Sequence, residues 1–179
     1  MPSEAPTETP GFVERGYHLA YGKDAGDFRF TVMAALTALT GLLYAATRYD
    51  ALLVFATITG CTAYYFYPLI ERKPRIGAGE YGVFIDGFGL ISWRAISEIA
   101  VVTFANRFNE TQELQFRLKI PLDQALLADW RRLPVWRLLM KLPWAMSHDN
   151  VVRIAMEPFA PITPDEIHRH FQRLWKYYR

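Results

Sequence analysis

The sequence predicts an α+β membrane protein in which a transmembrane helical hairpin precedes an antiparallel β-sheet domain with a C-terminal helix. Three observations predict this class: two apolar runs close together, several short β-like runs after them, and an amphipathic helix pattern at the end. We divide the chain into an N-terminal segment (1–27), a hairpin (28–70) and a domain (75–179) with an inserted amphipathic segment (121–149).

The apolar runs are Phe30–Thr47 and Ala51–Ile70, and neither contains a formally charged side chain. A helix rises about 1.5 Å per residue and bilayer hydrocarbon is about 30 Å thick, so each run is close to the length of a span. Only two uncharged spans argue against a self-contained transporter or channel. A cleavable signal peptide is the competing interpretation of the first run. The apolar run begins only near Phe28, after a segment with several acids, so an uncleaved span fits better.

Small residues recur at helical spacing within both runs. They are Ala34, Ala38 and Gly41 in the first run, and Ala56 and Gly60 in the second. Small residues on one face let two helix backbones approach closely. We expect these stripes to pack the two helices on each other, with docking to a partner as the alternative. The only cysteine, Cys61, lies in the second run and excludes an intrachain disulfide.

Basic residues near the ends of the runs predict the orientation. Arg15, Lys23 and Arg29 precede the first run, Arg72, Lys73 and Arg75 follow the second, and Arg48 alone lies between them. Lysine and arginine resist translocation, so both termini are expected on the cytoplasmic side of a bacterial inner membrane. The Pro-, Glu- and Thr-rich residues 1–10 predict a partly disordered N-terminal segment unless a partner holds it.

The domain begins with short runs of β-forming residues. Tyr81–Asp86 and Phe88–Trp93 flank Gly87 and predict a hairpin with a tight turn. Ile96–Phe104 and Glu113–Ile120 predict a second pair of strands, and Val151–Glu157 predicts a further one. The intervening turn is expected at Asn106–Thr111, whereas the glycine-rich residues 77–82 are read as linker and turn.

The last segment carries a strong helix start. Thr163 is a predicted N-cap, with Pro164 at the first helical position and Glu166 three residues after the cap. Apolar residues then follow at spacings of three and four, which predicts one buried face. They are Ile167, Phe171, Leu174 and Tyr178.

Residues 82–99 resemble the core signature of bacterial pleckstrin-homology-like domains in small membrane proteins. The matching features are a glycine-containing strand, a strand ending in Ser92-Trp93, and Glu98 before Ile99. The resemblance extends to the two N-terminal transmembrane helices and the C-terminal helix. It implies a curled antiparallel sheet capped by a helix, without enzymatic activity. Residues 121–150 depart from the pattern, and the lysine cluster needed to carry over phosphoinositide binding is missing.

The inserted segment is rich in tryptophan and basic residues. Candidate membrane-interface or lipid-contact residues are Trp130, Arg131, Arg132, Trp136, Arg137, Lys141 and Trp144. Indoles and basic side chains are typical of a segment at the headgroup level of a membrane. The alternative is that Trp136, Leu139, Met140 and Trp144 cover an open face of the sheet. Both interpretations stay open, and they are compatible.

Signatures of other function classes are lacking in the sequence. The net charge of +2 is too small to indicate nucleic-acid binding. His168 and His170 lie two apart on a helix and diverge, so we expect no metal site, and we expect no cofactor either. His148-Asp149 reads as a surface turn. We therefore expect a non-enzymatic membrane protein that acts as an accessory or assembly subunit of a larger complex, with lipid-headgroup sensing as the alternative.

Overall fold

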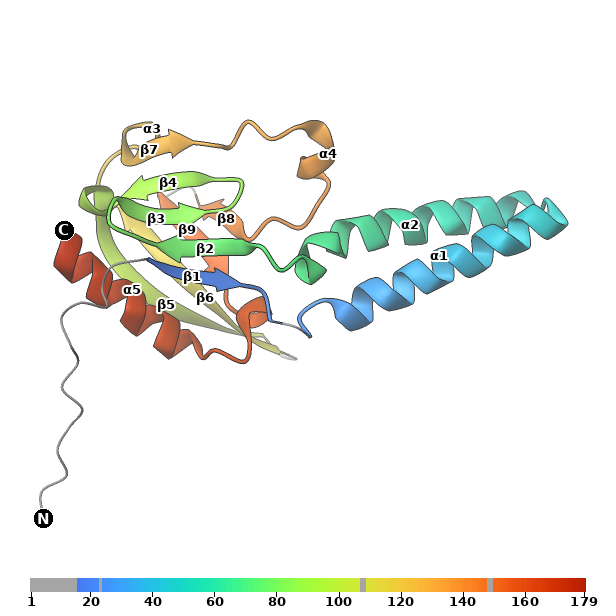
Figure 1. The fold of residues 1–179 in the computed structure, drawn as a ribbon, viewed down its shortest axis with the longest axis horizontal. Helices are drawn as coiled ribbons and strands as arrows, with labels where there is room; N and C mark the ends of the chain where they lie inside the picture. Colours follow the sequence, from blue (N-terminus) through green and yellow to red (C-terminus); the bar gives the residue numbers. More distant parts are fainter. Residues whose placement is uncertain (1–15, 23, 107–108, 148–149) are drawn as a thin grey trace, which may run out of the picture.

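The computed structural model shows a two-helix hairpin projecting from one end of a β-rich domain (Figure 1). It describes residues 16–22, 24–106, 109–147 and 150–179. The expected disorder of residues 1–10, the basic residues Arg15 and Lys23 and the turn at His148-Asp149 lie outside the described residues. The α+β class is confirmed, because two long apolar helices are followed by antiparallel sheets and a C-terminal helix.

The hairpin consists of α1 (Asp27–Thr47) and α2 (Asp50–Ile70), each of 21 residues. A helix of that length extends about 31 Å, which matches the hydrocarbon thickness of a bilayer. Both helices are long and apolar enough to cross a membrane. Most of their surface is exposed, unlike the surface of a core helix in a soluble domain. Arg48, in the left-handed conformation at φ 56°, turns the chain between them.

The two helices meet along a face that carries threonine. The Thr37 and Thr59 hydroxyl oxygens lie 3.0 Å apart across the interface, within hydrogen-bond distance. Thr40, Thr59 and Ala63 are buried in the hairpin. Each threonine hydroxyl also bonds to a backbone carbonyl of its own helix. Such back-bonding satisfies the hydroxyl without water and suits an apolar environment.

The predicted small residues lie differently relative to this face. Gly60 approaches the Thr37 side chain closely, so it belongs to the contact between the helices. Ala34 and Ala56 are half-buried, Ala38 is exposed, and a Cβ at Gly41 would meet open space. The contact therefore runs along the threonines rather than along the whole small-residue stripe, because a hydrogen bond between threonines fixes the rotation of the helices.

The first sheet has five antiparallel strands in the order β1-β2-β3-β4-β7. They are β1 (Tyr17–Ala20), β2 (Pro74–Ala78), β3 (Gly82–Ile85), β4 (Gly89–Ser92) and β7 (Leu126–Asp129). The hairpin predicted around Gly87 is confirmed as β3–β4, and Gly87 adopts the positive φ of 70° that such a turn requires. Strand β2 replaces part of the expected linker at residues 77–82.

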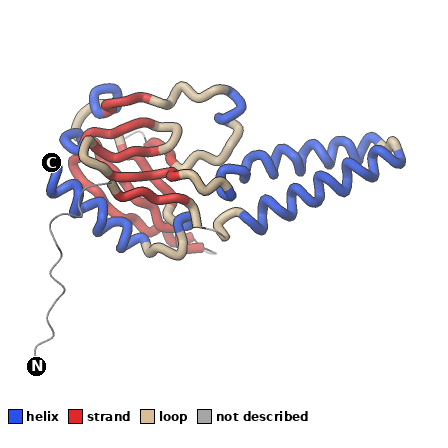
Figure 2. The backbone as a smooth tube through the Cα atoms, in the orientation of Figure 1, coloured by secondary structure: helices blue, strands red, loops and turns tan. Residues whose placement is uncertain are grey.

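The second sheet has four antiparallel strands in the order β5-β6-β9-β8. They are β5 (Ile96–Asn106), β6 (Asn109–Leu118), β8 (Trp144–Ser147) and β9 (Val151–Ala155). The predicted strands at 96–104, 113–120 and 151–157 are confirmed here, and the β5–β6 strands continue into the turn expected at 106–111. The strands and the purely helical hairpin are shown together in Figure 2.

The expected single curled sheet is corrected to two separate sheets, neither of them curled. A 3₁₀ turn, η2 (Trp93–Ala95), follows β4 and carries the chain from the first sheet to the second. Segment 121–149 contributes to both sheets, because it contains α3 (Leu122–Ala125), β7, α4 (Val135–Leu138) and β8. It is therefore part of the domain framework and not only an amphipathic addition.

Helix α5 (Pro164–Tyr178) covers one side of the two sheets and begins as the sequence predicts. The Glu166 N–H donates to the Thr163 hydroxyl at 3.3 Å. Phe171 is fully buried and contacts both sheets, since its ring lies 5.9 Å from Tyr17 and 5.6 Å from Phe116. A second 3₁₀ turn, η3 (Glu157–Phe159), leads from β9 toward this helix.

Strand β1 links the chain before the hairpin to the chain after it. Tyr17 pairs with Ala78 and Leu19 pairs with Ile76, in an antiparallel register. The residues that enter α1 and those that leave α2 are consequently held side by side at the base of the hairpin. The N-terminal segment from Tyr17 onward thus belongs to the first sheet, and it lies on the same side of the hairpin as the domain.

We expect Gly26→Ala to weaken the base of the hairpin. A Cβ at Gly26 would lie 2.3 Å from Leu69 Cβ, so α1 and α2 would have to move apart where they join the domain. Overpacking of this kind costs about 1–3 kcal/mol. Thermal unfolding of the purified protein in detergent measures the loss. Gly41→Ala is the matched control, because its Cβ meets open space, and an equal loss there would contradict the steric explanation.

Candidate functional site

The junction between the hairpin and the domain gathers most of the residues singled out from the sequence. Trp144 packs on the core, with its ring 4.8 Å from that of Phe88. Trp130 and Trp136 instead remain 44% and 57% exposed. The inserted segment therefore divides into an end that covers the sheets and a tip that leaves apolar side chains at the surface.

The exposed tip is formed by α4 and the residues on either side of it. Its exposed apolar side chains are Val135, Trp136, Leu138 and Leu139. Figure 1 shows α4 at the end of the domain from which the hairpin projects. We call residues 134–141 the α4 loop. Apolar side chains concentrated on one exposed loop are typical of a surface that meets lipid or another protein.

The α4 loop is hydrogen-bonded to α2. The Tyr64 hydroxyl donates to the Trp136 carbonyl at 2.9 Å, and the Lys141 N–H donates to the Tyr65 carbonyl at 3.0 Å. Tyr64 and Tyr65 precede the end of α2 by about 8 Å of helix rise. The loop consequently lies alongside the helix and not beyond its end.

Two of the four predicted lipid-contacting cations form ion pairs with carboxylates of the protein. Arg131 forms ion pairs with Asp129 at 2.7 Å and Asp123 at 2.9 Å. Hydrogen bonds from Arg131 lower the pKa of Asp129 to about 2 and hold the pKa of Arg131 above its usual range. Arg137 pairs with Asp86 at 2.7 Å. The sequence could not show these ion pairs. Because carboxylates of the protein already bind Arg131 and Arg137, the attraction of this segment for anionic lipid is weaker than expected.

The other two cations have different surroundings. Arg132 is exposed, and Lys141 is half-buried at the base of the hairpin. Burial lowers the pKa of Lys141, and the nearby Arg29 lowers it further. Of the predicted interface residues, only Trp130, Arg132 and Trp136 present largely exposed side chains.

A buried arginine, which the sequence analysis treated only as an orientation signal, connects the hairpin to the domain. Arg75 is 3% exposed and forms an ion pair with Asp86 in the β3–β4 turn. It also donates to Glu71 at 2.8 Å and to the Pro68 carbonyl at 2.9 Å. Because Asp86 also binds Arg137, one carboxylate joins the end of α2, the first sheet and the α4 loop.

We expect the protein to lose stability at high pH because the phenol of Tyr21 is buried. Burial raises the pKa of this phenol to about 12, with Arg75 opposing the shift and Asp86 adding to it. Between pH 10 and 12 the unfolded chain loses the proton that the folded protein retains. The stabilisation of the folded state by the protonated Tyr21 is complete below about pH 10. It falls by about 2 kcal/mol as the pH rises from 10 to 12.

Chemical unfolding in detergent at pH 9 and pH 12 measures this effect. Tyr21→Phe is the control, because it keeps the ring over which the Arg75 guanidinium lies at 5.5 Å and removes the titration. We expect a smaller pH-dependent loss in the variant than in the natural protein. Equal losses would contradict the assignment to Tyr21.

In the described part of the chain, no group of three or more His, Cys, Asp or Glu side chains is placed to hold a metal ion. The ring of His168 contacts the Ile99 carbonyl at 2.9 Å, and that of His170 stacks on Tyr17 at 4.5 Å. Comparison of the chain with protein-family models, curated proteins and solved structures finds no match. Fold and site together define an α+β protein with a hairpin suited to a membrane.

Proposed function

We propose that this protein is an integral protein of the bacterial inner membrane, with the hairpin in the bilayer and both termini in the cytoplasm. The length, apolar character and exposed surface of α1 and α2 support the membrane location. The pairing of β1 with β2 supports a location of both ends of the hairpin on the same side of the membrane. Basic residues at that end, with Arg48 alone at the turn, support the cytoplasmic side.

We further propose that the protein acts without catalysis, as an accessory or assembly subunit of a larger membrane complex, with the β-rich domain as its interaction surface. The single observation that carries this proposal is that ion pairs and hydrogen bonds hold the domain against the base of the hairpin. Arg75, Asp86 and the α4 loop hold the domain to α2, which gives the domain one orientation relative to the hairpin. A fixed orientation presents one constant surface to proteins in the same membrane.

Purification in mild detergent tests this function. The tagged full chain, at its natural expression level, is expected to elute in a species larger than the protein with bound detergent. The same partner should be present in a constant ratio and should bind again after separation and reconstitution. A tagged two-span protein of similar abundance is the control. A chain that elutes strictly as a monomer with no constant partner would contradict the proposal.

Sensing of anionic lipid headgroups is the second candidate, favoured by the exposed Trp136, Leu139 and Arg132 on one loop. The test uses the full chain, because a fragment of residues 75–179 lacks edge strand β1. Reconstituted in vesicles with or without anionic lipid, the protein should show salt-dependent quenching of Trp136 by brominated lipid. The Trp136→Phe variant supplies the background. Quenching that ignores both anionic lipid and salt would contradict sensing.

A further inference from the structure

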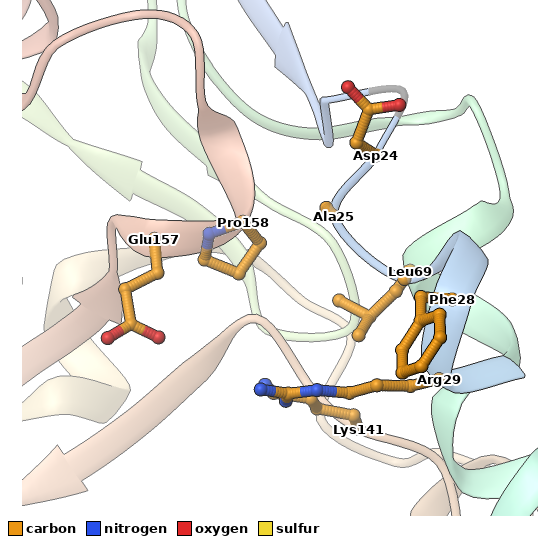
Figure 3. Close-up of a pocket in the computed structure, with 9 residues that line it drawn as sticks. Asp24, Ala25, Phe28, Arg29, Leu69, Lys141, Glu157 and Pro158 are labelled. Carbon is orange, nitrogen blue, oxygen red and sulfur yellow. The ribbon is translucent and has the colours of Figure 1, made fainter.

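A polar cavity of about 280 Å³ lies at the base of the hairpin, on the domain side of α1 and α2. Figure 3 shows its lining, in which the Arg29 and Lys141 side chains extend together and Glu157 lies on the facing wall, whereas the Asp24 carboxylate points away from them. Phe28 and Leu69 form its apolar part. The cavity therefore carries two cations and two carboxylates at the level where a lipid headgroup would lie.

These four charged groups are unpaired within the described part of the chain, since none of them forms an ion pair there. Arg29 lies close enough to disfavour the charge of Lys141, while Glu157 favours it. An anion between two such cations would relieve that repulsion and accept charge-assisted hydrogen bonds from both. The carboxylate of Glu157 on the facing wall would in turn suit a primary ammonium group.

An apolar groove of about 750 Å³ runs along α2 beside this cavity. Leu139 and Phe66 line the groove, and the Arg29 guanidinium lies over the Phe66 ring, 5.8 Å from its centroid. Phe66 therefore belongs to the groove and also touches the cation that lines the cavity. An amphiphile with a polar head in the cavity and a chain in the groove would cover both.

We propose that this cavity holds the headgroup of an aminophospholipid, with its phosphate between Arg29 and Lys141 and its ammonium toward Glu157. The proposal rests on the membrane location proposed above. A carboxylate that faces the two cations favours this zwitterionic head over a purely anionic one. A choline head is disfavoured because its trimethylammonium group has no N–H to donate to a carboxylate.

Native mass spectrometry of the delipidated full chain in detergent tests the proposal. The probe is an equimolar mixture of phosphatidylethanolamine, phosphatidylglycerol and phosphatidylcholine with identical acyl chains. We expect phosphatidylethanolamine to be preferred, and Arg29→Gln or Lys141→Gln to lower its binding about tenfold. Glu157→Gln should remove the preference over phosphatidylglycerol. Arg48→Gln, at the far end of the hairpin, and Arg132→Gln are the matched controls and should retain the preference.

Several outcomes would overturn the assignment. These are a preference for phosphatidylglycerol, equal binding of phosphatidylcholine, or an equal loss in the controls. Soluble phosphoethanolamine that binds as tightly as the lipid would show that no acyl chain is recognised, and would overturn the lipid as occupant. Alkaline extraction of membranes that contain the chain separates the two proposals. An integrated chain without lipid preference refutes only this inference, whereas an extracted chain refutes the membrane location.

Discussion

Asp86→Ala is expected to lower the free energy of unfolding by about 3 kcal/mol, because the buried Arg75 then keeps only one of its two carboxylate partners. Arg75 is 3% exposed, and Asp86 is its partner from the first sheet. Among the described residues, the buried Arg75 Nε atom has no hydrogen-bond partner. Truncation also frees Arg137, so the α4 loop should loosen from the β3–β4 turn.

Chemical unfolding in detergent measures the stability change, and limited proteolysis within residues 134–141 reports on the loop. Glu98→Ala is the matched control, because it removes the carboxylate of a surface pair with Arg117 whose side chains are 55% and 63% exposed. Exposed pairs contribute between 0 and about 1 kcal/mol. Similar losses in the two variants would mean that Asp86 does not carry the junction.

Ile58→Arg is expected to reduce membrane integration strongly, at a cost of about 3 kcal/mol for an arginine near the bilayer centre. Ile58 lies near the middle of α2 and is 59% exposed. In a water-soluble protein the same change at an exposed position would shift stability by no more than about 0.5 kcal/mol. The size of the effect therefore separates a hairpin in lipid from a hairpin in water.

Alkaline extraction of membranes gives the integrated fraction for this test. Tyr81→Arg is the control, since Tyr81 is 70% exposed in the domain and should tolerate a charge. Full integration of Ile58→Arg, equal to that of the control, would place this face of α2 outside the hydrocarbon. That result would overturn the proposed membrane location.

Local signals in the sequence predicted the hairpin helices, the β3–β4 turn and the C-terminal helix. Each depends on residues close together in the chain, such as the Asp86-Gly87 turn or the cap of Thr163 over Glu166. Strand β1 was missed because four residues, Tyr17–Ala20, carry too weak a pattern. The division into two sheets was missed because it depends on which strands pair. The strands within residues 121–149 pair with strands that are distant in the chain, and such pairing has no local sequence signal.

The candidate site shows the same division at the level of side chains. Sequence composition identified residues 130–144 as unusual, but it could not separate Trp144, which packs on Phe88, from the exposed Trp136. It also could not indicate that Arg131 and Arg137 would be occupied by carboxylates. Charge pairing between residues 51 apart, such as Asp86 and Arg137, is decided by the fold.

By itself, the sequence determined the α+β class, the two apolar helices and the caps and turns that bound the regular elements. Hydrophobic periodicity and local backbone preferences are sufficient for those features. Only the tertiary structure decided that β1 closes the base of the hairpin, that Arg75 and Asp86 fasten it to the domain, and that Arg29 and Lys141 share a cavity. These features join groups distant in the chain, so their energies arise only once the sheets bring them together.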